Sequence, residues 1–419
     1  MFELSFAFLA NLSASSAVHL YWYYFLFEFP RFILSALAVA VASVLRERPD
    51  SPKDLLVSVL IVGLNDKAGL ARTLQSLKSQ THKNLEIIVV QDGPGTTMYQ
   101  LGKEFEASGD IQKYIKTEIR GGKAAALNIG FTRCSSEYVV VADIDTSFDR
   151  NAISTIIGRL LSDKKIGGVS GNLAPRNLAS GFWPSVQAIE YLNNITIGRQ
   201  FQSMFGILTI VSGAFGAFRA SAIRSVGGWD VGPGDDSNLT TKIRLSGWKI
   251  QFEPDAWALT DVPDSFLALW TQRLRWNRSL IRNRWRKFRS VFNPFLHNFS
   301  LVEVVAATNQ LWFNFIATFA YLFYIFYSII TYGEWAIMII LSLHIIMFVF
   351  DVLLFLQAAT LHPRGYFWKL VLYLPAYALY GGFLMRANRV YAYLSELLFR
   401  SSYNDSFYPT KVRQQQEKF

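Results

Sequence analysis

Cysteine and acidic residues are scarce in this sequence, and each shortage removes a class of protein. The single cysteine, Cys134, excludes an internal disulfide framework and a cysteine-rich zinc site. The 31 acidic residues are outnumbered by 41 lysines and arginines, which gives a net charge of +10. The basic residues gather beside apolar segments, around Arg46 to Lys53 and again from Arg273 to Arg289. We therefore expect a lipid bilayer, and no nucleic acid, as the partner of this charge.

Charge is missing altogether from two long stretches near the carboxyl terminus. Val304 to Gly333 contains no charged residue, and Trp335 to Leu361 contains only Asp351 besides His344. Each stretch exceeds the roughly 20 residues that cross a bilayer. Together with 51% hydrophobic residues, they predict a multi-pass protein of the inner or plasma membrane.

The amino-terminal residues carry no lysine or arginine before Arg31, which argues against a cleaved secretory signal. They are expected to remain as an anchor of one or two crossings. Because basic residues flank the apolar segments, the soluble part between them is expected in the cytoplasm.

These patterns divide the chain into five expected parts. They are a membrane anchor (1–50), a cytosolic α/β domain (51–262), an amphipathic interfacial segment (263–298), transmembrane helices (299–400) and a cytosolic basic tail (401–419). A second amphipathic helix on the membrane surface is expected from Trp183 to Phe205.

The α/β domain begins with a strand, a helix and a second strand. Val57 to Val62 and Leu85 to Val90 are apolar runs of strand length, and Leu70 to Gln80 between them has helical spacing. This order predicts a parallel βαβ unit with its ligand site at the carboxyl ends of the strands. Asn65 and Asp92 follow those ends.

Two later motifs in this domain suit a nucleotide diphosphate. Gly121-Gly122-Lys123 opens a helix of small residues, where backbone amides and an ammonium favour a phosphate. Asp143 and Asp145 follow a third strand, Tyr138 to Ala142, and face the same way, so both can approach one Mg²⁺ or Mn²⁺ ion. A tight turn and a pair of solvated acids are the plainer alternatives.

The last two motifs combine acids with a basic aromatic helix. Asp235 and Asp236 follow a glycine-rich segment and are expected in a turn, where one carboxylate could act as a base. Gln272, Arg275 and Trp276 are spaced to share one face of a helix that starts after Pro263-Asp264-Ser265. Solvated caps and a plain membrane-surface helix are the alternatives for these two motifs.

Taken in order, these motifs resemble those of the processive family-two glycosyltransferases, which include the cellulose, chitin, hyaluronan and poly-N-acetylglucosamine synthases. The resemblance covers roughly residues 57 to 282 and implies a GT-A-like, Rossmann-type cytosolic domain fused to transmembrane and interfacial helices. It rests on Asn65, Gln91-Asp92-Gly93, Gly121 to Asn128, Asp143-Ile144-Asp145, Gly213 to Arg219, Gly234-Asp235-Asp236 and Gln272-Arg273-Leu274-Arg275-Trp276.

The resemblance also implies roles for individual residues. Asp236 would be the catalytic base, with Asp235 beside it, and Trp276 and Gly213 would contact the acceptor. Asp145 with Asp143 would hold Mg²⁺ or Mn²⁺. The nucleotide would be bound by Asn65, Asp92, Lys123, Asp143, Gln272, Arg275 and, from the tail, Lys411. Gln91, Asp235 and Asn238 depart from the residues that are commoner in the family.

The function expected from this resemblance is processive, inverting synthesis of a β-linked polysaccharide. The donor would be a UDP-sugar, UDP-glucose or UDP-N-acetylglucosamine, and the growing polysaccharide would leave through the membrane helices, with room for accessory export subunits. Two alternatives stay open: transfer of one sugar to a lipid carrier, and a non-enzymatic membrane scaffold.

Overall fold

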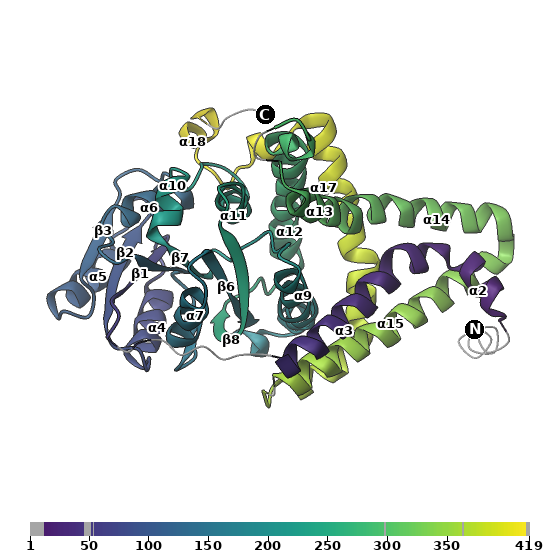
Figure 1. Ribbon diagram of the computed structural model, residues 1–419, viewed down its shortest axis with the longest axis horizontal. Coiled ribbons are helices and arrows are strands. Elements are labelled where there is room, and N and C mark those ends of the chain that lie inside the picture. Colours follow the sequence, from purple (N-terminus) through teal and green to yellow (C-terminus); the bar gives the residue numbers. More distant parts are fainter. Residues whose placement is uncertain (1–11, 46–51, 53, 297–298, 363, 416–419) are drawn as a thin grey trace.

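A mixed β-sheet and a set of long apolar helices make up the chain (Figure 1). The computed structural model describes residues 12–45, 52, 54–296, 299–362 and 364–415. The outermost parts of the expected anchor (1–11) and tail (416–419), and the predicted basic flank at 46–51, lie outside the described residues. The boundaries of the five expected parts remain predictions.

Eight strands of the described chain form one sheet, in the order β3-β2-β1-β4-β7-β6-β8-β5. β4 pairs in parallel with β1 on one side and antiparallel with β7 on the other. The strands are β1 (Val57–Gly63), β2 (Leu85–Gln91), β3 (Lys113–Lys116), β4 (Tyr138–Asp143), β5 (Ser147–Phe148), β6 (Ile166–Pro175), β7 (Phe215–Arg219) and β8 (Lys249–Thr260).

The predicted βαβ unit is confirmed, and its register explains why polar residues meet at one edge. β1 and β2 run in parallel with Val57 opposite Leu85, and β4 lies on the other side of β1. The helix predicted from Leu70 to Gln80 is α4 (Lys67–Lys78), with the Asp66 carboxylate accepting from the Gly69 N–H as its cap.

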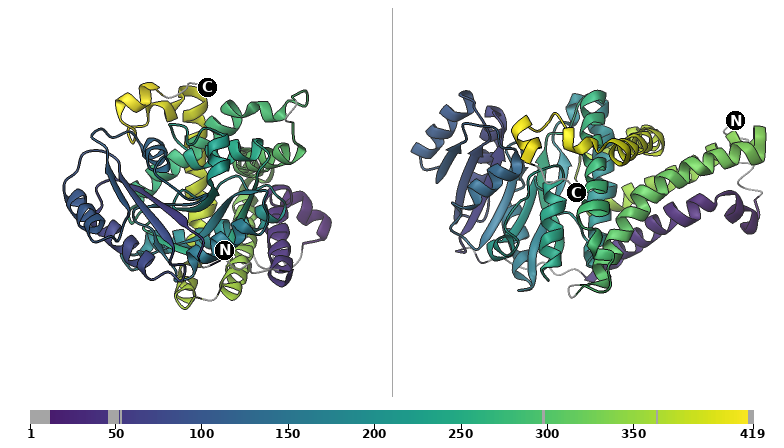
Figure 2. Two further views of the ribbon diagram at one scale, coloured as in Figure 1. Left: turned by 60° about the vertical axis from the view of Figure 1, so that its left-hand side comes forward. Right: turned by 90° about the horizontal axis from the view of Figure 1, so that it is seen from above.

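Helices of the sheet domain pack around the strands (Figures 1 and 2). They are α4, α5 (Thr97–Ala107), α6 (Lys123–Phe131), α7 (Ala152–Leu161), α10 (Ala220–Ser225) and α11 (Asp235–Leu245). α6 packs on β1 and β2, and α7 on β6 and β8.

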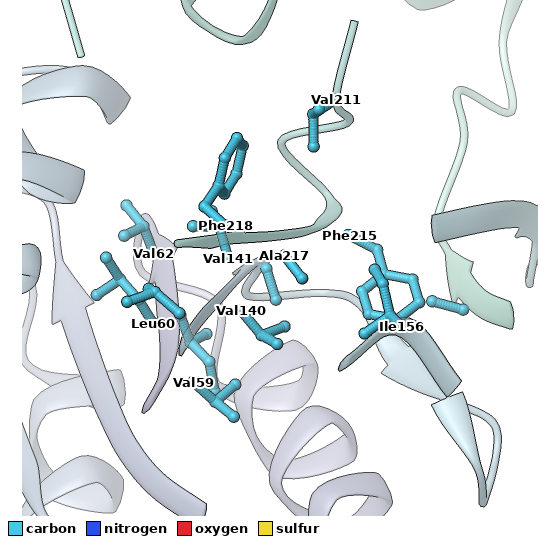
Figure 3. Close-up of a cluster of buried hydrophobic side chains, with 14 of the residues drawn as sticks. Val59, Leu60, Val62, Val140, Val141, Ile156, Val211, Phe215, Ala217 and Phe218 are labelled. Carbon is cyan, nitrogen blue, oxygen red and sulfur yellow. The ribbon is translucent and has the colours of Figure 1, made fainter. Parts of the chain in front are cut away.

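The core of this domain is built from the apolar strand residues that sequence periodicity identifies. Val59, Val140, Phe215 and Ala217 are fully buried, and they come from neighbouring strands of the sheet (Figure 3). Burial of a side chain of this size stabilises the fold by roughly 1.5–3 kcal/mol.

The remaining helices include the long apolar ones, the shorter ones that join them to the sheet, and one in the tail. They are α2 (Ala14–Leu20), α3 (Phe29–Leu45), α8 (Phe182–Tyr191), α9 (Gly198–Met204), α12 (Phe266–Leu280), α13 (Leu301–Gln310), α14 (Ala317–Tyr332), α15 (Ala336–Leu361), α16 (Leu374–Leu379), α17 (Met385–Phe399) and α18 (Thr410–Gln415). Several are joined by short π-helical or 3₁₀ segments, named η below.

Within the described residues, three helical runs are long and apolar enough to cross a membrane: Tyr24–Leu45, Leu301–Leu361 and Phe367–Phe399. The second run reverses at Gly333, whose φ of 54° breaks the helix, so α14 and α15 form a hairpin with α3 beside α15 (Figures 1 and 2). The two expected carboxyl-terminal spans correspond to α14 and α15. Phe367–Phe399 is a further candidate span that follows them.

The segment expected to form a surface helix, Trp183 to Phe205, is helical in the structure, and its position at a membrane surface stays a prediction. α8 and the turn η3 (Leu192–Ile197) are largely buried, whereas α9 is only partly buried, and together they pack against β6, α3 and α15. The segment is amphipathic because it fills the junction between sheet and membrane helices. Arg364 also crosses this junction and forms an ion pair with Asp149.

Candidate active site

The loop between β3 and α6 is fixed by the carboxylate at the end of β2. Both oxygens of Asp92 are used, one accepting from the N–H of Gly121 at 2.7 Å and the other from that of Gly122 at 2.9 Å. Gly122 has φ of 86°, a conformation that favours glycine. Asp92 therefore shapes the loop that opens α6 and presents Lys123.

Lys123 is the centre of the site, because acids from two distant segments surround it. Its ammonium is ion-paired with Asp143 at the end of β4. Burial would lower the pKa of Lys123, but Asp143, Asp235 and Asp236 outweigh it and raise the pKa above its usual value. The lysine is therefore charged and ties the strand-end acids to those of α11.

Gly213 lies close to both Lys123 and Asp236. A Cβ atom there would stand 2.8 Å from Lys123 Nζ and 3.7 Å from Asp236 Oδ2. The Gly213 N–H points at Asp236 Oδ2 over 3.4 Å, a long hydrogen bond. Any side chain at this position would displace the lysine from the acids.

Asp235 and Asp236 are in the first turn of helix α11, so their predicted turn is wrong. Gly234, with φ of 76°, precedes the helix, and the packing of Leu239 and Ile243 in the core extends the helix back to it. A helix amino terminus carries partial positive charge and favours carboxylates. Burial and the neighbouring Asp236 nevertheless raise the pKa of Asp235 to about 7.

The two acids at the end of β4, Asp143 and Asp145, also repel each other. Burial, and then the charges of Asp143 and Asp261, raise the pKa of Asp145 to about 6. The Thr260 hydroxyl donates to Asp145 Oδ1 at 3.4 Å, and Arg176 holds the backbone oxygen of Asp145 and the Asp261 carboxylate. Arg176 has no counterpart in the sequence motifs.

A divalent cation fits this pair chemically. No group of three His, Cys, Asp or Glu side chains gathers anywhere in the described ranges, so protein ligands alone would be few. Oxygen donors in small number suit Mg²⁺ or Mn²⁺, which keep water or phosphate oxygens as further ligands. A cation near Asp145 would also offset the crowding that raises its pKa.

Arg199 is a site residue that the sequence motifs do not identify. Its guanidinium donates to Ser170 Oγ at 2.9 Å, and Asp236 acts on it electrostatically from α11. Burial is the larger effect and lowers the pKa of Arg199. Nothing in the local sequence marks this arginine, because its partners lie on β6 and α11.

Helix α12 is the predicted basic aromatic helix, and it packs directly on the start of α11. Asn283, one turn beyond α12, donates to Ser237 Oγ at 2.8 Å. A Cβ atom on Gly234 would stand 2.8 Å from Ser279 Cβ. On its other side α12 contacts α17, where Asn277 donates to Asn388 Oδ1 at 3.0 Å.

The three residues expected to share a face of α12 divide between two sets of contacts. Arg273 donates to Gln272 Oε1 at 2.7 Å, lies 4.2 Å from the ring centre of Trp276, and is ion-paired with Glu190 at 2.7 Å. Trp276 itself is 48% exposed. Arg275 points elsewhere, to the ring of Phe407 at 4.1 Å.

The tail reaches the site, but through aromatic residues and not through Lys411. Phe407 stacks with Arg275, and the Tyr408 ring lies 3.6 Å from the Cβ position of Gly122. Burial and the charge of Asp235 raise the pKa of Tyr408. Lys411 is exposed on α18, above α11 in Figure 1.

Asn65 remains at the edge of this arrangement. Its side-chain oxygen accepts from Thr97 Oγ1 at 3.0 Å and from the Met98 N–H at 3.1 Å, so it caps α5. The structure thus gathers Asp92, Lys123, Asp143, Asp145, Gly213, Asp235 and Asp236, places Arg275 nearby through the tail, and leaves Lys411 apart.

Residues 58–227 match the family described as Glycosyl transferase family 2. These residues are similar to family 2 glycosyltransferases. The match covers the strands and loops that carry Asp92, Lys123, Asp143, Asp145 and Gly213, and it ends before α11.

Curated relatives extend the similarity further along the chain. The poly-beta-1,6-N-acetyl-D-glucosamine synthase of Staphylococcus epidermidis is 33% identical over 234 residues, 55% of this chain and 56% of that protein. The enzyme of the same name from Staphylococcus aureus strain COL is 32% identical over 235 residues, 55% of this chain and 57% of that protein. The matched region is thus little more than half the length of these relatives.

A solved structure supports the fold of the glycosyltransferase domain and its attached helices. The mannosyltransferase PcManGT from Pyrobaculum calidifontis, in complex with GDP-Man and Mn²⁺, superposes with a TM-score of 0.57 at 19% identity, covering 87% of this chain and 99% of that one. This confirms the expected GT-A-like architecture.

Proposed function

We propose that this protein is a membrane-embedded, inverting glycosyltransferase that polymerises a β-linked polysaccharide from UDP-N-acetylglucosamine. The observation that carries the proposal is the convergence of Lys123, Asp143, Asp236 and Gly213 directly beside α12. The similarity to two poly-beta-1,6-N-acetyl-D-glucosamine synthases favours this sugar over glucose.

The residues divide into a donor side and an acceptor side. Lys123 offers an ammonium to the donor phosphates, and Arg275 a guanidinium able to form two parallel hydrogen bonds with them. A divalent metal held by Asp145 and Asp143 would neutralise the diphosphate leaving group. Mn²⁺ accompanies GDP-Man in the solved mannosyltransferase, which is consistent with such an ion.

Asp236 is the proposed base. Its carboxylate is in the first turn of α11 and faces Gly213, where an acceptor hydroxyl could approach. Transfer with inversion needs one base to take the hydroxyl proton as the oxygen attacks the anomeric carbon. Asp235 beside it tunes that base through its own charge.

Trp276 is the proposed platform for the acceptor sugar. A half-exposed indole offers a broad apolar face to the C–H side of a pyranose. Arg273 holds the ring from one side by a cation–π contact. Repeated addition requires that the new chain end return to this platform after each transfer, with the polymer passing between the membrane helices.

Transfer of one sugar to a lipid carrier is the second candidate. The apolar helices beside the site favour it as much as they favour export of a polymer. The two candidates differ in the acceptor and in the length of the product, since donor and base would be the same.

The test is incubation of the purified full-length protein with a panel of labelled UDP-sugars, followed by gel sizing of the product. We expect incorporation from UDP-N-acetylglucosamine into long chains. A product of one sugar on lipid would support the second candidate, and absence of transfer from every donor would refute both.

Processivity is tested by separating Trp276 from Arg275. Trp276→Ala should shorten the product while UDP affinity is retained, whereas Arg275→Ala should weaken use of the donor. Product length is normalised to folded protein, because a tryptophan that only anchors α12 would lower yield and leave length unchanged. Unchanged length would remove Trp276 from the acceptor site.

A further inference from the structure

A basic cavity of about 930 Å³ lies where the interfacial helix ends, outside the site described above. It is bounded by the turn η4 (Ile281–Lys287), the turn η5 (Arg289–Phe292), the start of the turn η6 (Leu311–Ile316) and the end of α17. Five cations line it, and no acidic residue does: Arg284, Arg286, Lys287, Arg289 and Arg400.

Two of these five charges have a carboxylate partner. Arg286 is ion-paired with Glu396 at 2.7 Å, and Lys287 with Asp230 at 2.5 Å. The other three, Arg284, Arg289 and Arg400, have no carboxylate within ion-pair distance in the described part of the chain. The cavity therefore carries excess positive charge.

Arg284 shows that this excess extends below the surface. Its side chain is 4% exposed, and it donates to neutral oxygens, those of Gln310 and Thr241 at 2.6 Å each. The nearby carboxylate of Glu303 is taken by Arg244 at 2.6 Å. Burial and the charge of Arg244 lower the pKa of Arg284 to about 10, so it stays charged at pH 7 and has no ion-pair partner of its own in the described chain.

The rim of the cavity is apolar and continues toward the membrane helices. Trp285 is 50% exposed, Phe292 41% and Leu397 38%. Leu398 and Phe399, at the end of α17, are 69% and 73% exposed. Leu311, in the wall, belongs to the candidate span Leu301–Leu361. A water-soluble anion would leave this apolar rim uncovered.

We propose that the cavity binds the phosphodiester head group of an anionic phospholipid, with its acyl chains against Trp285, Phe292 and Leu397. Guanidinium groups form paired hydrogen bonds with phosphate oxygens, and exposed apolar side chains beside a basic cluster suit acyl chains. The proposed lipid site is separate from the glycosyl-transfer site, and the lipid is a ligand in addition to the sugar donor and acceptor.

The bound lipid would stabilise the helix that carries the proposed catalytic base. Arg284 donates to Thr241, which is on α11, the helix that begins with Asp235. An anion beside Arg284 would hold this guanidinium in place and with it the helix that carries the proposed base.

Binding is measured on the purified full-length protein by native mass spectrometry with phosphatidylglycerol or phosphatidylcholine added. The variant Arg289→Gln with Arg400→Gln removes two exposed cations whose side chains make no hydrogen bond or ion pair with the described residues, so the fold should be kept. We expect phosphatidylglycerol affinity to fall about 30-fold, which at about 1.4 kcal/mol per tenfold is the effect of two cations at a membrane surface.

The matched control is Arg133→Gln with Lys164→Gln, two exposed cations of the sheet domain. It should bind phosphatidylglycerol like the wild type, and phosphatidylcholine should bind weakly to all three proteins. Equal binding by the cavity variant, or an equal loss in the control, would overturn the proposal. Displacement of the lipid by millimolar inorganic phosphate would also overturn it, in favour of a soluble anion. Because the readout is lipid retention, a failure here leaves glycosyl transfer untouched.

Discussion

Replacing Arg273 with glutamine tests how the acceptor platform is held. Arg273 is 4% exposed, is ion-paired with Glu190 at 2.7 Å and lies 4.2 Å from the ring centre of Trp276. Glutamine removes the positive charge and leaves the largely covered Glu190 carboxylate without its arginine. The Tyr380 hydroxyl, which donates to the same carboxylate at 2.7 Å, cannot replace a full charge.

The expected loss can be worked out from these contacts. Removing one partner of a buried ion pair costs about 3–5 kcal/mol, and losing the cation–π contact adds about 0.5–2 kcal/mol. At about 1 °C per kcal/mol for a chain of 419 residues, the melting temperature should fall by about 4–7 °C. Because Trp276 loses its support while Arg275 keeps Phe407, the product should shorten at nearly unchanged donor affinity.

The assay is thermal unfolding of the detergent-purified variants Arg273→Gln, Glu190→Gln and the two combined, with product sizing on each. The double variant removes both charges, so it should be less destabilised than the sum of the single variants. Additive losses would show that the ion pair is not coupled. Full-length product from folded Arg273→Gln would show that Trp276 does not depend on this arginine.

Three further predictions concern the reacting groups. Asp236→Asn keeps the shape but cannot accept a proton, so turnover should fall by roughly 10²-fold or more while UDP binding persists; near-full activity would place the base elsewhere. EDTA should abolish turnover, with Mg²⁺ or Mn²⁺ restoring it, and undiminished turnover in EDTA would rule out the Asp143 and Asp145 ion. Because the pKa of Asp235 is raised to about 7 by burial and by Asp236, turnover should decline as pH falls through about 7, where the pair takes up a proton. In Asp235→Asn the like charge beside Asp236 is gone, so this decline should move to lower pH; a profile that stays in place would show that the pair does not control it.

The strands and the basic helix could be predicted from the sequence because their signals are local. β1, β2 and β4 are continuous apolar runs buried on both faces, and their boundaries differ from the predicted ones by one residue at most. The start of α12 follows from Ser265, which precedes Phe266 as the helix cap. Once β1, β2 and β4 are predicted to be parallel, the acids at their carboxyl ends can be predicted to lie at the same edge of the sheet.

What could not be predicted depends on partners far away in the chain. The glycines before Asp235 favour a turn, but core packing of Leu239 makes it the start of a helix. Arg199 and Arg273 acquire their roles from Ser170, Asp236 and Glu190, at distances no motif encodes. In the tail, Phe407 and Tyr408 reach the site and Lys411 does not. The rings pack against Arg275 and Gly122, and these contacts are distant in the sequence.

The position of β4 between β1 and β7 creates a hazard while the protein is being made. β4 is apolar almost throughout, and its second neighbour, β7, begins roughly 70 residues after it ends. At about 5–20 residues per second of synthesis, the open edge of β4 would stay unpaired for roughly 4–14 s. An uncovered apolar edge strand pairs readily with another chain, so overproduction that places nascent chains side by side should favour aggregates joined through β4.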